Sequence, residues 1–127
     1  MSISISRAHY WGLRMMYKAI LLALLSALIG SLGQLGFKLG SGSFTLEPRI
    51  LITNYYFLAG ISLYAVSTII YMFALRQGHL SIIYPVIATS YIWVTLLSGV
   101  ILDEPINSTN LIGITLILIG VTIIAWR

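Results

Sequence analysis

Three polar side chains recur at helical spacing inside an apolar stretch near the amino end of the chain. Ser31, Gln34 and Lys38 follow one another at intervals of three and four residues, and Gly30 and Gly33 lie beside them. An α-helix places residues at these intervals on one face. Burying a carboxamide or an ammonium group without a partner is costly. This face is therefore a candidate lining for a ligand-binding cavity.

Tyrosines extend the candidate lining to two later segments. Tyr64 and Tyr71 are seven residues apart, and so are Tyr84 and Tyr91. Seven residues are about two helical turns, so each pair shares one helix face. Together with the first face, the tyrosines would line a cavity of hydroxyl groups, one amide and aromatic rings. Such a cavity holds almost no fixed charge.

The residue types that most enzymatic chemistry requires are few or widely separated. There is no cysteine, and the two histidines, His9 and His79, are far apart. Asp103 and Glu104 are adjacent, so on a helix they would point about 100° apart and make no catalytic pair. The seven basic residues are too scattered for a nucleic-acid surface. We therefore expect no enzyme, no cofactor, no metal site and no nucleic-acid partner.

Four apolar segments must position these residues. The chain has 127 residues, of which 59% are hydrophobic and 8% are charged, whereas a soluble domain carries about 25% charged residues. A helix needs about 17–25 apolar residues to cross a bilayer, and an open sheet cannot cross one because its edges stay unpaired. The pattern predicts an all-α integral membrane protein with four transmembrane helices in a compact bundle, at about 17–39, 54–76, 80–102 and 110–126.

The predicted domain organisation is one membrane domain, 17–127, after a short arm, 1–16. Tyr10 and Trp11 in the arm suit the headgroup zone of a membrane, so we expect the arm to lie at the interface. The third helix contains Pro85 directly after Tyr84, where a proline removes a backbone hydrogen bond and predicts a kink.

Structural explanations also exist for the polar face of the first helix. Ser31 and the two glycines can simply allow helices to approach closely. Lys38 lies near a helix end and can extend its ammonium group to the interface. Gln34 lies about a turn deeper, where an unpaired amide is costly. For each of these residues, a structural role and a place in the lining of a ligand-binding cavity both stay open.

The order of several short motifs resembles the drug/metabolite transporter superfamily. Ser26–Lys38 is similar to its first helix. The later helices are similar in Ile83–Pro85, Tyr91–Thr95, Asp103–Pro105 and Gly113–Val121. The resemblance covers residues from about 17 to 126. It implies a small transporter or transporter subunit.

Two four-helix groups of that superfamily are the main alternatives. Small multidrug resistance exporters resemble the chain in length and in Gly113 and Gly120, which in that group would mediate dimer packing. Their proton coupling depends on a glutamate in the first helix, and alignment on Gly30 places Ala27 at that position. The small subunits of the aminoarabinose-phosphoundecaprenol flippase are more similar, through Gly33–Gln34, Lys38, Tyr84–Pro85 and Glu104–Pro105.

The resemblance to these flippase subunits implies translocation of a polyprenyl-phosphate-linked sugar or similar amphiphile in the bacterial inner membrane. Lys38 would then attract the phosphate, Gln34 and the tyrosines would hydrogen-bond the sugar, and Glu104 would meet a cationic amino group. A homodimer, or a heterodimer with a related four-helix chain, is expected because four helices are few for an enclosed pathway. The alternatives are an exporter of small cationic compounds and a non-transporting subunit of a membrane complex.

The distribution of basic residues predicts the orientation in the membrane. An even number of crossings places both termini on the same side as the turn at Gln77–His79. That side carries five basic residues, Arg7, Arg14, Lys18, Arg76 and Arg127, and the other side carries two, Lys38 and Arg49. Basic loops stay in the cytoplasm, so we expect single cysteines introduced at position 3 and at the carboxyl end to be labelled only from the cytoplasmic side. Labelling from both sides would contradict this orientation.

Overall fold

The computed structural model describes residues 2–126, and it describes the side chains of residues 12–124 and of Trp126. Within this range every regular element is a helix, which confirms the predicted all-α fold. The elements in chain order are α1 (Ser2–Gly40), the 3₁₀ turn η1 (Ser41–Ser43), α2 (Pro48–Thr53), α3 (Tyr55–Gln77), α4 (Leu80–Ile87), α5 (Ser90–Ile101) and α6 (Ser108–Ala125).

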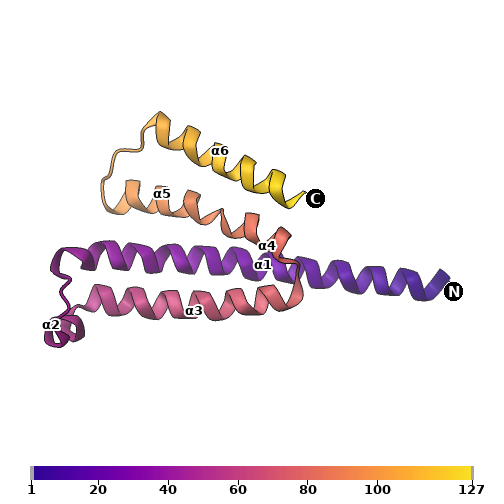
Figure 1. Cartoon of the computed structure of the whole chain (residues 1–127), viewed down its shortest axis with the longest axis horizontal. Helices are drawn as coiled ribbons and strands as arrows, with labels where there is room; N and C mark the ends of the chain where they lie inside the picture. Colours follow the sequence, from indigo (N-terminus) through magenta and orange to yellow (C-terminus); the bar gives the residue numbers. More distant parts are fainter. Residues whose placement is uncertain (1, 127) are drawn as a thin grey trace.

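Three helical stretches are long and apolar enough to cross a membrane: Gly12–Ser43, Tyr55–Gln77 and Leu80–Ile101. The fourth, α6, has 18 residues, which just exceeds the lower limit of about 17 for a membrane span. Successive spans run in opposite directions, and both termini and the α3–α4 turn point toward one end of the bundle (Figure 1). The chain is therefore a multi-span membrane protein.

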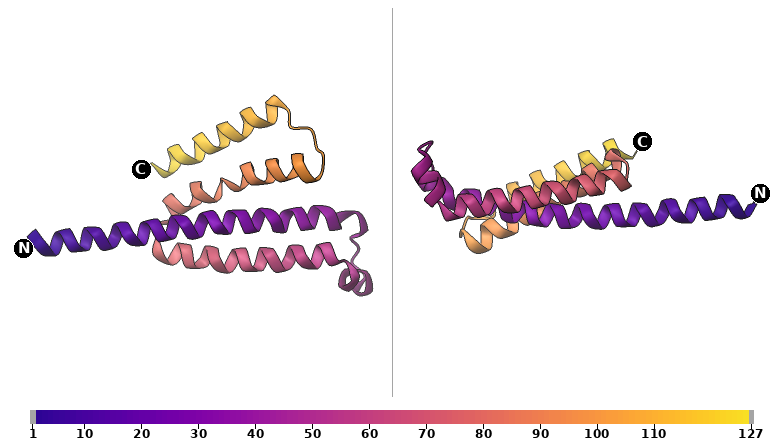
Figure 2. Two further views of the ribbon diagram at one scale, coloured as in Figure 1. Left: turned by 180° about the vertical axis from the view of Figure 1, so that it is seen from behind. Right: turned by 90° about the horizontal axis from the view of Figure 1, so that it is seen from below.

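The first helix is longer than predicted. It has 39 residues and begins at Ser2, so the backbone of the predicted arm, 1–16, is helical from there and continuous with the first membrane span. In both views of Figure 2 this part of α1 extends beyond the other helices. The side chains of Tyr10 and Trp11 lie outside the described ones, and the interfacial position of the arm stays a prediction.

The predicted third helix, 80–102, is broken into α4 and α5. Pro85 lies inside α4, but the break comes three residues later, at Ala88 and Thr89. The Thr89 N–H donates to the carbonyl of Val86 at 3.1 Å, one residue closer than in an α-helix, and the Thr89 hydroxyl donates to the same oxygen at 2.7 Å. Pro85 has no N–H to donate and its ring crowds the turn that precedes it, whereas the break lies in the turn that follows it. The kink at Pro85 itself stays a prediction.

α1 and α3 pack with their backbones almost in contact. A Cβ atom added at Gly36 would lie 3.0 Å from backbone atoms of Gly60 and Tyr56, and one added at Gly60 would lie 2.9 Å from the carbonyl oxygen of Gly33. Lipid provides little hydrophobic drive for helices to associate, so close packing between small residues takes its place. Gly30 and Gly33 both face α3 in this contact.

Two buried serines add polar contacts to the same interface. The Ser26 hydroxyl donates to the Ser67 carbonyl at 2.9 Å, and the Ser67 hydroxyl donates to the Ser26 carbonyl at 2.8 Å. Both side chains are buried. The exchange satisfies both hydroxyl groups where lipid offers them no partner.

Both ends of the α1–α3 pair are closed by specific contacts. At one end the Asn54 side chain donates to the Gly40 carbonyl at 2.9 Å and accepts the Phe57 N–H at 3.2 Å, so it ties the end of α1 to the start of α3. At the other end Ile83 of α4 is fully buried against alanines of α1 and α3. These contacts fix where α5 begins relative to α1.

The last helix is the least enclosed. α6 packs mainly against α4, and its large apolar side chains are exposed along most of its length. A Cβ added at Gly113 or Gly120 would meet nothing within 4 Å. Both glycines therefore face open space, and their role in packing against a second chain stays a prediction.

The close α1–α3 contact predicts a difference between two glycine substitutions. Gly60→Ala introduces a methyl group against the Gly33 carbonyl, whereas Gly120→Ala introduces one into open space. Both variants gain up to about 1 kcal/mol from the higher helix propensity of alanine. The difference in stability between them therefore comes from the overpacking at position 60 alone. We expect Gly60→Ala to be less stable than Gly120→Ala by about 1–3 kcal/mol, as measured by reversible unfolding in detergent. Equal stability would show that α1 and α3 are not in backbone contact.

Candidate functional site

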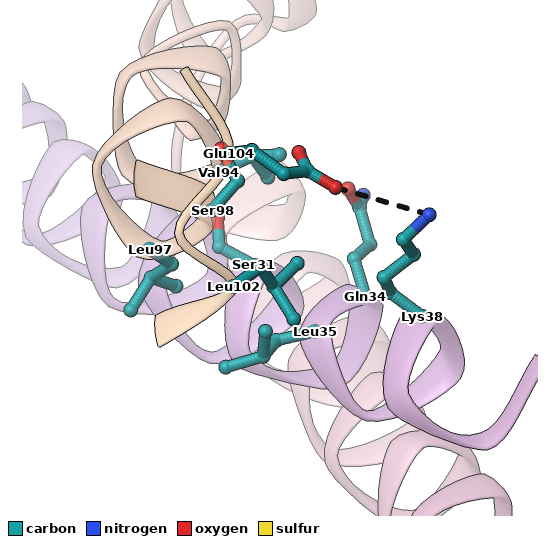
Figure 3. Close-up of a pocket in the computed structure, with 9 residues that line it drawn as sticks. All are labelled: Ser31, Gln34, Leu35, Lys38, Val94, Leu97, Ser98, Leu102 and Glu104. Atoms are coloured by element: carbon teal, nitrogen blue, oxygen red, sulfur yellow. Dashed lines mark ion pairs between the residues drawn. The ribbon is translucent and has the colours of Figure 1, made fainter. Parts of the chain in front are cut away.

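A groove lies between α1 and α5, open at the end of the bundle opposite the chain termini. It has a volume of about 270 Å³. Figure 3 shows side chains from both helices and from the loop after α5 pointing into it. Its lining consists of Ser31, Gln34, Leu35, Lys38, Val94, Leu97, Ser98, Leu102 and Glu104. Three residues of the predicted first-helix face and Glu104 therefore line one groove.

An ion pair stands at the mouth of the groove. The Lys38 ammonium nitrogen is 3.8 Å from a carboxylate oxygen of Glu104, and the two side chains are 61% and 46% exposed. At this distance and exposure the pair is loose, and a ligand can compete for either charge. The sequence does not predict this contact, which places a positive and a negative group side by side.

The loop after α5 places Glu104 in this position. Asp103 has a φ of 52°, in the left-handed region that aspartate tolerates better than most residues. The Glu104 N–H then donates to the Ser98 carbonyl at 3.2 Å, so the chain folds back over the last turn of α5. This turn brings the Glu104 carboxylate toward α1. Asp103 is not in the groove lining.

Ser31 lines the groove, but its hydroxyl is already occupied. The side chain is 1% exposed, and its hydroxyl lies 2.7 Å from the Ala27 carbonyl and 3.4 Å from the Ser90 carbonyl. One hydroxyl proton cannot serve both acceptors fully, so the shorter bond dominates. The contact of Ser31 with the start of α5 is therefore the weaker of the two, and its donor is not free for a ligand.

Gln34 lies between two cavities and lines both of them. It lines the groove described above and also a second cavity of about 210 Å³ between α1, α3 and the α4–α5 break. Within the described part of the chain its carboxamide makes no hydrogen bond. Its donors and acceptor are therefore free for a ligand in either cavity.

The second cavity contains most of the predicted tyrosines. Tyr64, Tyr71 and Tyr84 line it, together with Gly30 and with small and hydroxyl-bearing residues: Ser26, Ala27, Ser67, Thr68, Ile87 and Ser90. Tyr91 is different, because its side chain lines neither cavity. The structure thus separates the expected single cavity into two and leaves Tyr91 outside both.

Sequence reasoning did not select several of the lining residues. Ser98 is seven residues after Tyr91 and belongs to the helix that carries the groove wall, and Ser67 lies three residues after Tyr64. Helical spacing was the signal that could have found both. The position of Ser90 was not readable, because it depends on where the third helix breaks.

The groove offers the contacts that reversible binding of a polar group needs. Within the described residues, no group of three or more His, Asp or Glu side chains could hold a metal ion. The groove combines apolar walls, hydroxyl and amide groups, and one exposed pair of opposite charges.

The bundle and its groove define a small multi-span membrane protein with a candidate binding groove along its first helix. The chain belongs to the putative transmembrane family 234, whose model matches residues 25–125. It is also similar to a protein of Aeromonas hydrophila subsp. hydrophila described as a probable 4-amino-4-deoxy-L-arabinose-phosphoundecaprenol flippase subunit. The two are 30% identical over 116 residues, which cover 84% of this chain and 79% of that protein. No solved structure matches the chain.

The exposure of the ion pair predicts that it contributes little to folding. Exposed pairs of this kind are worth less than about 1 kcal/mol. We therefore expect Lys38→Ala and Glu104→Gln to change the free energy of unfolding by less than about 1 kcal/mol, with Gly60→Ala as a destabilised reference. A loss of several kcal/mol in either variant would show that the pair holds the loop after α5 in place.

Proposed function

We propose that the protein is a flippase subunit that moves a polyprenyl-phosphate-linked sugar, or a similar amphiphile, across the bacterial inner membrane. The observation that carries this proposal is the groove between α1 and α5, largely uncharged along its length with an exposed Lys38–Glu104 pair at its mouth. The similarity to a protein named as a flippase subunit supports it.

The chemistry of the groove fits such a substrate. A flippase shelters a polar head group while a long apolar tail stays in lipid. Charge at the centre of a membrane costs at least about 2.5–3.5 kcal/mol, so a site for a charged head belongs at the edge of the bilayer. Lys38 lies there, close to the end of α1, and its ammonium group can pair with a phosphate.

The neighbouring carboxylate adds a second recognition element. The related protein is named for a substrate that contains both an amino sugar and a phosphate. A ligand with both charges can exchange the Lys38–Glu104 contact for one contact with each residue. A ligand with a phosphate and an uncharged sugar uses Lys38 and leaves the half-exposed Glu104 in contact with water, so the groove admits both kinds of head group.

The word subunit in the relative's name supports a second chain in the working protein. The groove is open on one side, and α6 presents an exposed apolar face with Gly113 and Gly120 in open space. A homodimer, or a heterodimer with a related four-helix chain, would cover these surfaces. We place both termini in the cytoplasm, as the basic residues predict.

Export of small cationic drugs has less support. Ala27, which stands where exporters of that class are expected to carry a glutamate, is 3% exposed and lines the second cavity. Glu47, Asp103 and Glu104 are the acidic residues of the chain, and all three lie outside the helices. A proton-coupled exchange within the membrane would therefore lack its carboxylate.

The groove predicts which variants lose transport. We expect Lys38→Ala and Gln34→Ala to lower the rate of translocation about tenfold or more, since a hydrogen bond to a charged group is worth about 1.5–3 kcal/mol. Lys38→Arg should keep most of the rate because it keeps the charge. The assay follows a fluorescent polyprenyl-phosphate sugar in proteoliposomes made with the protein and any chain that co-purifies, with chemical quenching of the outer leaflet.

Tyr91→Phe is the matched control, because Tyr91 lines neither cavity. It should transport at the wild-type rate. Full activity of both alanine variants would show that the groove is not the transport site. If Lys38 only anchors the helix at the interface, Lys38→Ala and Lys38→Arg should both be fully active.

A further inference from the structure

The second cavity differs chemically from the groove beside it. Its lining includes three tyrosines, two from α3 and one from α4, and no charged side chain, whereas the groove holds Lys38 and Glu104. Its α1 residues, Ser26 to Gly30, lie near the middle of the apolar run that ends before Lys38. The cavity therefore lies deep in the membrane, where a charged ligand would be costly.

The free polar groups of this cavity are the phenols, one amide and the Ser90 hydroxyl. Ser26 and Ser67 satisfy each other, and the Thr68 hydroxyl donates to the Tyr64 carbonyl at 2.9 Å. The hydroxyls of Tyr64, Tyr71 and Tyr84 make no hydrogen bond to any residue that the structure describes. A phenol both donates and accepts, so three phenols and the Gln34 carboxamide match a ligand that carries many hydroxyl groups.

The size and position of the cavity add to this match. Its volume of about 210 Å³ is below the range of about 300–1,000 Å³ found for pockets of drug-sized ligands, so it suits a single sugar ring. From Gly30 to Lys38 the axis of α1 rises by about 12 Å. Gln34 lies halfway between them and lines both cavities.

We propose that this cavity is a second binding site, specific for an uncharged polyhydroxylated ring, and separate from the charged site at Lys38 and Glu104. Gln34 belongs to both sites and passes the ring from one to the other. The proposal rests on the proposed function in one respect, that a single amphiphile uses both sites in turn. The specificity of the second site for a neutral sugar follows from its own lining.

The test compares two probes that share one tail. Dodecyl-β-D-glucoside carries a neutral sugar ring, and dodecyl phosphate carries a phosphate without a sugar. Binding is measured by titration calorimetry on purified full-length protein in lauryldimethylamine oxide, whose head group has neither sugar nor phosphate. We expect Tyr64→Phe/Tyr71→Phe to lower the glucoside affinity about tenfold, because each lost hydroxyl removes one hydrogen bond, and to leave dodecyl phosphate unchanged.

Four further variants complete the comparison. Lys38→Gln should lower the affinity for dodecyl phosphate and leave the glucoside unchanged, and Gln34→Ala should lower the glucoside affinity. Tyr84→Phe, on α4, is a second and independent removal of a phenol from the cavity, with a smaller loss of glucoside affinity. Tyr91→Phe is the control for removing a phenol outside both cavities and should change neither affinity.

The outcomes separate this proposal from the proposed function. Unchanged glucoside binding in both the double variant and Tyr84→Phe would overturn the second site, as would a wild-type protein that does not bind the glucoside. If Lys38→Gln lowered the affinity for both probes, the two probes would share one site, and the proposal of a second site would also be overturned. Tyrosine-dependent glucoside binding without Lys38-dependent phosphate binding or translocation would keep the second site and reject the flippase function.

Discussion

The contact between the backbones of α1 and α3 is the constraint on which the rest of the structure depends. At Gly33, Gly36 and Gly60 the helices are too close for a side chain. Because lipid does not drive apolar helices together as water does, this contact and the Ser26–Ser67 exchange hold the pair in one register. A fixed register turns one face of α1 toward α3 and leaves the next face for α5.

The site occupies the faces of α1 that remain. Gln34 and Lys38 lie beside the face of α1 that packs on α3, so their side chains reach the space in front of α5. Ser31 lies close to the start of α5, with its hydroxyl 3.4 Å from the Ser90 carbonyl. Beyond that point the two helices carry long apolar and polar side chains, and the groove between them opens toward Lys38 and Glu104. Packing on α3 and binding in the groove thus use different faces of α1, whereas the second cavity borders the α1–α3 contact itself.

The sequence predicted the spans well and the site partly. Long runs without charge predict membrane helices because an open sheet of the same composition cannot cross a bilayer. Helical spacing placed Ser31, Gln34 and Lys38 on one face, and all three line the groove. The Lys38–Glu104 contact could not be predicted, because it depends on the left-handed turn at Asp103. The division into two cavities depends on the break at Ala88–Thr89, and Pro85 indicated an irregularity without its position. For the same reason Tyr91, one position past the start of α5, was assigned to the lining but lies outside it.

The break between α4 and α5 is also a point about which α5, one wall of the groove, can rotate relative to α4. α4 is anchored by Ile83 against α1 and α3, whereas α5 beyond Ser90 is joined to the rest of the bundle by fewer buried side chains. The 12 residues of α5 extend about 18 Å from the break. A rotation of about 10° there displaces the far end by about 3 Å, close to the present separation of the Lys38 and Glu104 charged groups. A small change in two backbone torsions near Thr89 would therefore change the Lys38–Glu104 separation by an amount comparable to its present 3.8 Å.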